Sequence, residues 1–482
     1  MADRKDWPPN GWDNVYDAYH EYAAWYSGST DRLINFYSSK AGPFWSKEVK
    51  NDRMTMLHVP VAGDIASVSS DLLFAEAPDI KIPQAHQEDA PQDAKDTQDR
   101  LNEIINETDM YSRFLEAGET ASALGGVFLK INWDTTYKPY PILSVAQPDN
   151  AIPEFKWGFL KRVTFHKVID APNMNDYWRL LEIHEVGRIK NQLWRGSRFD
   201  LGKQLPLEAR PETRGMESVI ETGINELACR YIPNKKPNRE WRGSNLGQSD
   251  YSGVIGLMDS LDETYTSWMR DLKLARGRIV VPEYMLDFED GEPKFDIDKE
   301  VFSPLSLGPA SADRQDKIEN IQFDIRADEH RDTVENLLEK IYTMAGYSPQ
   351  SFGMDNNGGG QLTATEIKAK ESKSYKTRNK KSRYMQGGLE EIIHIMLMID
   401  ANKFGSDINP EYRPQVNLRE GIESNPMEKA ESINKLNQAQ AISIDTKVRL
   451  LHNSWDEKQI QAEVNRIKRE QGIEVEEPEI RT

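Results

Sequence analysis

Residues 345–381 of this 482-residue chain read AGYSPQSFGMDNNGGGQLTATEIKAKESKSYKTRNKK. Three consecutive glycines stand in the middle of the stretch, and a dense run of lysine and arginine follows them. Eight of the seventeen residues from Ile367 to Arg383 are basic, although the whole chain carries a formal net charge of −18. The stretch therefore joins a glycine-rich segment to the most cationic part of an acidic protein, and its surroundings must explain that combination.

The glycine-rich segment predicts a loop from Tyr347 to Leu362. Glycine adopts backbone angles that other residues avoid, and it loses the most conformational entropy when it is ordered. Loops of this length are usually functional or disordered. The residues Thr363-Ala364-Thr365-Glu366 then form the pattern of a capping box, in which Thr363 and Glu366 satisfy backbone amides at a helix start. We therefore expect an adaptable loop followed by a well-defined helix.

The basic residues are expected to lie on that helix, where Glu371 is the one acid among them. The segment has almost no apolar stripe, so we expect it not to pack as an ordinary core helix. Like charges three and four residues apart repel one another, and an anionic surface must compensate them. That surface is either nucleic-acid phosphate or the acidic residues of this chain and its neighbours, and both remain open. After Gly387 and Gly388, where a kink is possible, the pattern becomes apolar on all sides and predicts a buried segment.

Two further helices are predicted on the N-terminal side of this stretch. The first covers residues 249–276, with an apolar stripe at steps of three and four and with Ser249 or Asp250 as its N-cap. The second runs from about Ala327 and ends before Gly346. Short β-branched runs and turn residues between the two helices predict a small β-containing insert. We expect the helices to run antiparallel and to carry the insert at their far end.

The rest of the N-terminal half predicts a body of mixed structure, since a chain of this length is expected to form two to four regions. The first hundred residues show helical spacing, and a polar, proline-containing stretch from Pro83 to Gln98 is interpreted as an exposed linker. From Gly125 onward the pattern is that of antiparallel β-structure, with a hairpin of residues 178–185 and 189–194.

Composition excludes several classes of protein. The one cysteine, Cys229, has apolar neighbours and is expected in a core, which favours a reducing compartment. The N-terminus lacks the apolar core of a signal peptide, and no apolar run approaches the roughly 18 residues of a membrane span. The acidic excess argues against a protein coated by nucleic acid on its outside, but not against one that touches DNA at a few points.

Enzyme chemistry finds little support in the sequence. The eight histidines are scattered, and none is paired at metal-ligand spacing. The glycine loop lacks the Gly-Lys-Ser/Thr of a nucleotide-binding loop, and no Gly-x-Ser-x-Gly motif is present. We therefore predict no catalytic residues, no metal site, no cofactor and no enzymatic activity.

The order of these parts, and two stretches in particular, resemble the portal proteins of tailed double-stranded DNA bacteriophages, of the siphophage SPP1-type or Gp6-like family. The stretches are RYIPNKKPNREWRGSNLGQSDYSGVIGLMDSLDETY at 230–265 and the quoted 345–381, where Ser-Pro-x-x-Phe-Gly precedes Thr-Ala-Thr-Glu. The resemblance implies an α+β portal fold with a mixed α/β wing, a two-helix stem, a small β-containing clip, a long helix behind a tunnel loop and a helical crown. The implied parts are the wing at 1–248, the first stem helix at 249–276, the clip at 277–326, the second stem helix at 327–346, the tunnel loop at 347–362, the long wing helix and return to the wing at 363–425, and the crown with the C-terminal tail at 426–482.

The resemblance also implies a function. Family members form rings, usually dodecamers, at one capsid vertex of the virion, and DNA passes through the channel during packaging and ejection. The terminase large subunit docks on the ring, head-completion proteins seal it, and major capsid and scaffold proteins surround it after assembly in the host cytoplasm, away from membranes. The implied channel residues are Gln350, Met354, Asn356, Asn357, Gly358, Gly359, Gly360 and Gln361. The basic helix would contact DNA or a neighbouring subunit through Lys370, Lys373, Lys376, Lys380 and Lys381. The alternative is a structural scaffold that assembles without touching DNA.

Overall fold

The computed structural model describes residues 6–46, 56–87, 89–274, 278–280, 287–289, 292–294, 319–321, 326–354, 371–418, 426–439, 441–452 and 457–472. The chain divides into two compact units. Unit 1 contains Met1–Tyr19, Asp64–Asp250 and Gly346–Thr482, and unit 2 contains His20–Gly63 and Tyr251–Ala345. The division falls inside two helices, α1 (Asp13–Tyr26) and α3 (Val61–Phe74).

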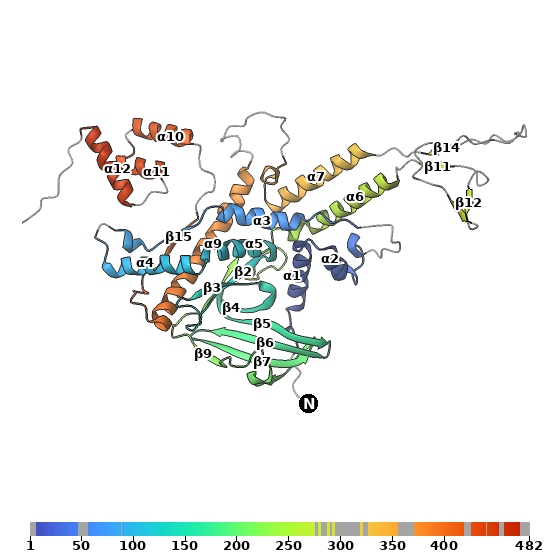
Figure 1. Ribbon diagram of the computed structural model, residues 1–482, viewed down its shortest axis with the longest axis horizontal. Coiled ribbons are helices and arrows are strands. Elements are labelled where there is room, and N and C mark those ends of the chain that lie inside the picture. The colour runs from blue at the N-terminus through green and yellow to red at the C-terminus, as the bar shows by residue number, and fades with distance from the viewer. Residues whose placement is uncertain are drawn as a thin grey trace, which may run out of the picture. The chain divides into compact units, whose positions relative to one another are not determined.

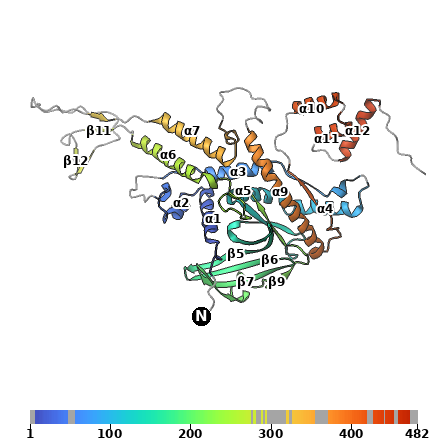
Figure 2. The same ribbon diagram turned by 180° about the vertical axis from the view of Figure 1, so that it is seen from behind.

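Unit 1 contains the β-structure that the sequence predicted from Gly125 onward (Figure 1). An antiparallel sheet has the order β4 (Ala151–Lys156), β5 (Phe159–Asn173), β6 (Asp176–Glu185), β7 (Arg188–Ser197) and β8 (Asp200–Leu205), and β9 (Val219–Glu221) pairs with β7. Strands β5, β6 and β7 lie side by side in both views (Figure 2). The predicted hairpin is confirmed as β6 and β7, which turn between Glu185 and Arg188.

A second sheet forms part of the main apolar core of unit 1. Its order is β10 (Cys229–Pro233), β2 (Gly126–Asn132) and β3 (Ile142–Ala146). The helices α4 (Gln92–Glu107), α5 (Met110–Leu124) and α9 (Ser372–Ile399) contribute side chains to the same apolar cluster. Cys229 is buried, as predicted, and burial raises the pKa of its thiol. The second half of α9 is apolar and buried, which confirms the prediction for the segment after Gly388.

The remaining elements of unit 1 are short. They are β1 (Asp79–Lys81) paired with β15 (Gln415–Asn417), η2 (Pro83–His86), η3 (Pro148–Asn150), η4 (Leu207–Ala209), η7 (Pro349–Phe352), the π-helix η8 (Asp400–Phe404), and the C-terminal helices α10 (Pro426–Gln438), α11 (Ile444–Leu451) and α12 (Glu457–Glu470). The helices α11 and α12 enclose a small core of their own around Val448 and Val464.

The stretch from Pro83 to Gln98 is not an exposed linker, so that prediction is wrong. It contains η2 and the first turns of α4, and the side chains of Thr97 and Gln98 are buried. The Gln98 carboxamide accepts a hydrogen bond from the Ile82 amide at 2.6 Å and donates one to the Ile80 carbonyl at 3.3 Å. A polar side chain that pairs with buried backbone groups belongs to the core, although its residue type suggests a surface.

Unit 2 contains two long helices, α6 (Ile255–Leu274) and α7 (Ala327–Ala345). The end of α6 meets the start of α7, because His330 stacks on Trp268 at 6.0 Å and lies 3.0 Å from the Asp271 carboxylate. The helices therefore run antiparallel, as predicted. Of the insert between them, the described strands are β11 (Arg278–Val280) paired with β14 (Glu319–Ile321), and β12 (Asp287–Glu289) paired with β13 (Glu292–Lys294).

One face of α6 binds the N-terminal part of unit 2 through polar side chains. The Asp262 carboxylate is fully buried, and it accepts hydrogen bonds from Trp45 Nε1 at 3.1 Å and the Val59 amide at 2.9 Å. It also lies 2.8 Å from Nδ1 of His58. Asp259, one turn earlier, accepts from the Phe44 amide at 3.1 and 2.9 Å. The other helices of this unit are α2 (Thr30–Tyr37), η1 (Phe44–Ser46) and η5 (Ser252–Val254).

Gly387 and Gly388 are neighbours in α9 but differ in what a β-carbon would contact. At Gly388 it would lie 2.5 Å from the Cγ1 and Cδ1 atoms of Ile232 on β10, whereas at Gly387 nothing lies within 4 Å. We predict that Gly388→Ala lowers the free energy of unfolding by about 1–3 kcal/mol, because it overpacks the core. Gly387→Ala should raise it by about 0.5–1 kcal/mol through helix propensity alone. Urea unfolding of both variants is the measurement, and equal effects would contradict the close approach of α9 to β10.

Candidate functional site

The N-terminal half of α9 has two polar faces. Lys373, Lys376, Lys380 and Arg383 are exposed at steps of three and four, and we call these residues the cationic stripe. The opposite face is buried, although its residues Ser374, Arg378, Lys381 and Ser382 are polar. The expectation that this segment does not pack is therefore wrong, because polar side chains with internal partners take the place of an apolar stripe.

Arg378 illustrates how a cation is accommodated on the buried face. Its Nε donates to the Leu72 carbonyl at 2.8 Å, and its Nη2 donates to the Leu418 carbonyl at 3.1 Å. The guanidinium thus joins α9 to α3 and to the chain that follows β15. Within the part of the chain that the structure describes, Lys376, Lys380 and Arg383 of the cationic stripe form no ion pair.

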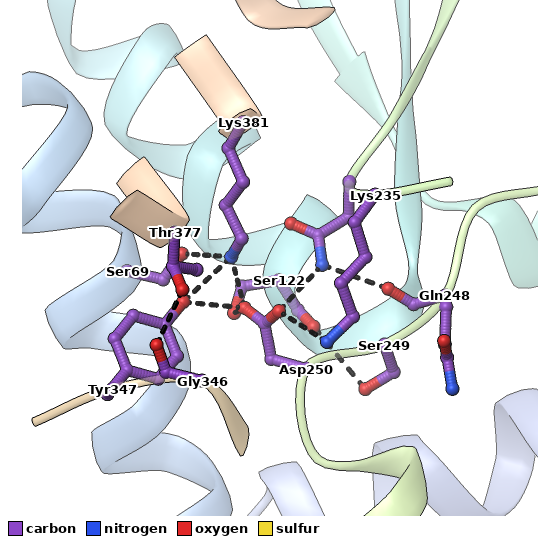
Figure 3. Close-up of polar contacts among 11 residues, drawn as sticks. Ser69, Ser122, Lys235, Gln248, Ser249, Asp250, Gly346, Tyr347, Thr377 and Lys381 are labelled. Atoms are coloured by element: carbon purple, nitrogen blue, oxygen red, sulfur yellow. Dashed lines mark hydrogen bonds and ion pairs between the residues drawn. The ribbon is translucent and has the colours of Figure 1, made fainter. Parts of the chain in front are cut away.

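A buried cluster around Asp250 lies beneath α9 (Figure 3). One carboxylate oxygen, Oδ2, accepts hydrogen bonds from the Ser122 hydroxyl at 2.5 Å and the Tyr347 hydroxyl at 2.9 Å, and it pairs with the Lys381 ammonium. The other oxygen, Oδ1, accepts from Asn234 at 3.0 Å and lies 3.2 Å from Lys235 Nζ. The carboxylate is therefore fully used inside unit 1. Asp250 does not act as the N-cap of α6, which begins only at Ile255.

Lys381 completes this cluster. Besides the ion pair with Asp250, its Nζ donates to Ser69 Oγ at 2.6 Å and to the Tyr347 hydroxyl at 2.8 Å. These three bonds use the three protons of the ammonium group. With 3 % of its side chain exposed, Lys381 is not available to DNA or to a neighbouring subunit. Lys381 therefore departs from the prediction that grouped it with the exposed lysines of α9.

Residues 346–348, which precede the three glycines, are hydrogen-bonded to Ser374, Thr377 and Lys381 of α9, and we call these three α9 residues the anchor. Ser351 Oγ also lies 2.8 Å from Ser374 Oγ. Thr377 Oγ1 donates to the Gly346 carbonyl at 2.5 Å, and the Ser348 amide donates to Ser374 Oγ at 2.8 Å. Lys381 supplies the third bond, to Tyr347. The spacing of three and four residues places the anchor on one face of α9. Sequence analysis missed it, because serine, threonine and lysine at these positions have no distinctive pattern.

The predicted channel residues fall mostly outside the described residues. Gln350 lies in η7 and is half-buried, and Met354 is the last described residue before the gap. Asn356, Asn357, Gly358, Gly359, Gly360, Gln361 and Lys370 lie outside the described ranges, as does the predicted capping box at 363–366.

Two carboxylates, the partly buried Glu182 and the fully buried Asp250, make unit 1 sensitive to acid. Burial alone would raise the pKa of Glu182 on β6, but His184 and Lys130 outweigh burial and lower the pKa to about 2. Burial would likewise raise the pKa of Asp250, but Lys381 and Lys235 hold it well below its usual range. A folded-state pKa below the unfolded-state value means that the unfolded chain binds more protons. The stabilisation is thus present above about pH 4 and is lost as pH falls toward about 2.

We therefore predict that the urea midpoint of unfolding falls steadily between about pH 4.5 and about pH 2.5. The Glu182→Gln variant should start from a lower midpoint at neutral pH and show a shallower decline, because its side chain no longer titrates. Midpoints measured by circular dichroism at several pH values check this expectation. Parallel curves for the two proteins would contradict the role given to Glu182.

The described residues contain no constellation for metal chemistry or membrane insertion. Among them, no group of three or more histidine, cysteine, aspartate or glutamate side chains is arranged to hold a metal ion. No helix within the described ranges has the length and apolar character that crossing a bilayer requires. The candidate site is defined by the exposed charges of α9 and by the anchor on its buried face.

Comparison with known proteins gives three results. Residues 8–477 match the family described as phage portal protein, SPP1 Gp6-like. No protein among those with curated descriptions matches. One similar solved structure is a chain in the virion of a native gene transfer agent particle, with 13% identity, a TM-score of 0.45 and coverage of 88% of this chain and 98% of that chain. Another comes from the neck of an empty gene transfer agent particle, with 13% identity, a TM-score of 0.46 and coverage of 86% and 96%.

Proposed function

Because the chain belongs to the SPP1 Gp6-like family of phage portal proteins, we propose that twelve copies form a ring whose channel conducts double-stranded DNA. As a portal protein it forms a channel at a capsid vertex and works as a structural component of a virion. In the proposed assembly, the terminase large subunit and head-completion proteins dock on the ring, and capsid and scaffold proteins hold it in the shell. Residues 277–326 serve as the clip and residues 426–482 as the crown.

The observation that carries this proposal is the cationic stripe of α9. In a chain of net charge −18, it is an exposed row of cations without an interspersed acid, and it begins soon after the glycine loop. From Lys373 to Arg383 the helix rises by about 15 Å. Phosphates of one DNA strand recur every ~3.4 Å along the duplex axis, so a row of cations of this length contacts the backbone wherever a strand passes it, whatever the base sequence. Such contacts hold DNA without reading its sequence.

The loop residues complement the stripe in this proposal. Asn356, Asn357 and Gln361 offer neutral hydrogen bonds, and Gly358, Gly359 and Gly360 allow the backbone to adapt as DNA advances. Neutral contacts hold DNA less tightly than cations do, since phosphate contacts dominate affinity. In this proposal the cationic stripe supplies the electrostatic contacts, and the neutral, glycine-rich loop adds contacts that let the DNA move.

The alternative function is a scaffold in which the stripe meets an acidic surface of the next subunit. A cleft of about 630 Å³ on unit 1 supplies such a surface, because Asp96, Asp99, Glu103 and Asp407 line it. An ion pair between subunits would compensate the same charges without DNA. The two possibilities differ in what salt does to the ring and to bound DNA.

We predict that Lys376→Gln, Lys380→Gln and Arg383→Gln together weaken DNA binding by assembled rings and flatten its salt dependence. The slope of log K against log salt should fall by about 0.9 for each phosphate that the ring no longer neutralises. Fluorescence anisotropy with a labelled duplex at several salt concentrations measures both quantities. The matched control replaces Lys95, Lys161 and Lys203, which are exposed on other elements, with glutamine. Equal slopes for the two triple variants would exclude DNA contact, and rings of the stripe variant that dissociate without DNA would support the subunit interface.

A further inference from the structure

The two flanks of the glycine loop are joined to each other within unit 1. Ser348 and Ser374 are 26 residues apart, Gly346 and Thr377 are 31 apart, and Tyr347 and Lys381 are 34 apart, yet each pair is hydrogen-bonded. The chain that enters the loop therefore lies on the helix that leaves it. The hydrogen bonds fix residues 346–348, which precede the three glycines, against the N-terminal half of α9.

Burial makes two of these contacts durable, the bond between Ser348 and Ser374 and the bond between Tyr347 and Lys381. Tyr347, Ser348, Ser374 and Lys381 have between 0 and 3 % of their surface exposed. In such a site water does not replace a broken hydrogen bond, so each opening leaves a buried polar group unpaired. The flanks should consequently stay together while the exposed stripe of the same helix meets solvent or a partner.

The ion pair extends this arrangement to the rest of unit 1. Asp250 is the last residue of unit 1 before the chain enters unit 2, and Gly346 is the first on its return. One carboxylate thus binds Ser122 at the end of α5, Tyr347 beside the return point and Lys381 on α9. The buried Asp250 carboxylate therefore links four segments of the chain that are distant in sequence.

A purely stabilising role explains this chemistry poorly. Well-packed apolar residues of similar volume are often as stable as a buried ion pair, or more stable. Hydrogen bonds add direction, because each is strong only near one geometry. A polar anchor therefore sets the relative position of its parts more narrowly than an apolar contact of the same area.

We propose that the anchor and Asp250 act as positioning residues, which hold both flanks of the loop in one place so that the loop adapts to DNA without displacing the chain on either side of it. The role given to the anchor rests on the proposed channel function, whereas the geometry of the anchor does not. In the proposed ring, the residues on either side of the loop then have the same position in every subunit. Local adaptation stays inside the loop and does not disturb the contacts between subunits.

The test removes two hydroxyls from the anchor in the full-length protein, with Ser374→Ala and Thr377→Val. The matched control variant carries Ser382→Ala and Thr333→Val, whose hydroxyls bond to carbonyls of their own helices, those of Asn379 and Glu329. Hydrogen exchange at the Ser348 amide should be at least about fivefold faster in the anchor variant than in the control, because that amide loses its acceptor. Ring assembly, measured as particle mass, should be the same for both.

DNA packaged per assembled capsid supplies the functional readout, and it should fall in the anchor variant alone. Restoring one hydroxyl with Ser374→Thr should recover both packaging and slow exchange. Unchanged exchange at Ser348 would overturn the anchor itself, and fast exchange with normal packaging would overturn its positioning role. Failure of the proposed function is separate, because it would show as absent DNA binding in wild-type rings while the exchange difference remained.

Discussion

Asp250→Ala is expected to lower the free energy of unfolding by about 3–5 kcal/mol. The substitution leaves the Lys381 ammonium buried without its counter-ion, and the hydroxyls of Ser122 and Tyr347 lose their acceptor. An uncompensated buried charge is among the most destabilising changes that one substitution produces. Urea unfolding followed by far-ultraviolet circular dichroism measures the loss, and the purified variant should also be less soluble.

Two further variants show whether charge is the cause. Asp250→Asn combined with Lys381→Met removes both charges together, and it should recover most of the stability lost in the single variant. Asp99→Ala removes a carboxylate that is exposed on α4, and it should change stability by less than about 0.5 kcal/mol. A loss below about 1 kcal/mol for Asp250→Ala would mean that water reaches Lys381, contrary to its burial.

The second large effect is expected in unit 2, where Asp262→Ala should cost about 3 kcal/mol or more. The Asp262 carboxylate accepts from Trp45 and from the Val59 amide, and it lies 2.8 Å from Nδ1 of His58. Within the described part of the chain, the other ring nitrogen of His58 is buried without a hydrogen-bond partner. The imidazole therefore depends on Asp262, and each donor left without an acceptor adds a desolvation cost.

Asp259→Ala is the control for this prediction, since Asp259 lies one turn away on α6. Its carboxylate accepts from the Phe44 amide and has a weaker backbone contact with Trp45, and burial raises its pKa. The expected loss is about 1 kcal/mol. Urea unfolding measures both variants, and hydrogen exchange at the Val59 amide reports on the region directly. Equal losses for Asp259→Ala and Asp262→Ala would contradict the central position assigned to Asp262.

Local sequence patterns were sufficient for the long elements of the fold. The antiparallel helices of unit 2 follow from apolar spacing and a terminal glycine, and the β6–β7 hairpin follows from two β-branched runs around a short turn. Strands β4 and β8 have no strand pattern of their own, because AIPEFK contains a proline and a glutamate and DLGKQL contains a glycine. These segments form strands because they pair with β5 and β7, and local propensity does not predict such pairing.

The candidate site was only half predictable for a related reason. Charge counting correctly identified a cationic helix, but it treated all of its lysines alike. The partner of Lys381 is 131 residues away in sequence, and a partner of Arg378 is 306 residues away. A single sequence gives no sign of such pairs. The anchor could not be predicted either, because the role of its hydroxyls is evident only once residues 346–348 are seen to lie against α9.

The burial of the lone thiol has a practical consequence. Thiol reagents react with the thiolate, and burial raises the pKa of Cys229 and covers the sulfur. The native chain therefore offers alkylating agents almost nothing to modify, and a cysteine introduced at Lys376 would accept a fluorophore with little background. Conversely, the slow alkylation of Cys229 itself measures how often the sheet of β10, β2 and β3 opens. In the wild-type protein, Cys229 therefore interferes little with labelling of α9, and its alkylation rate reports how often this part of the core opens.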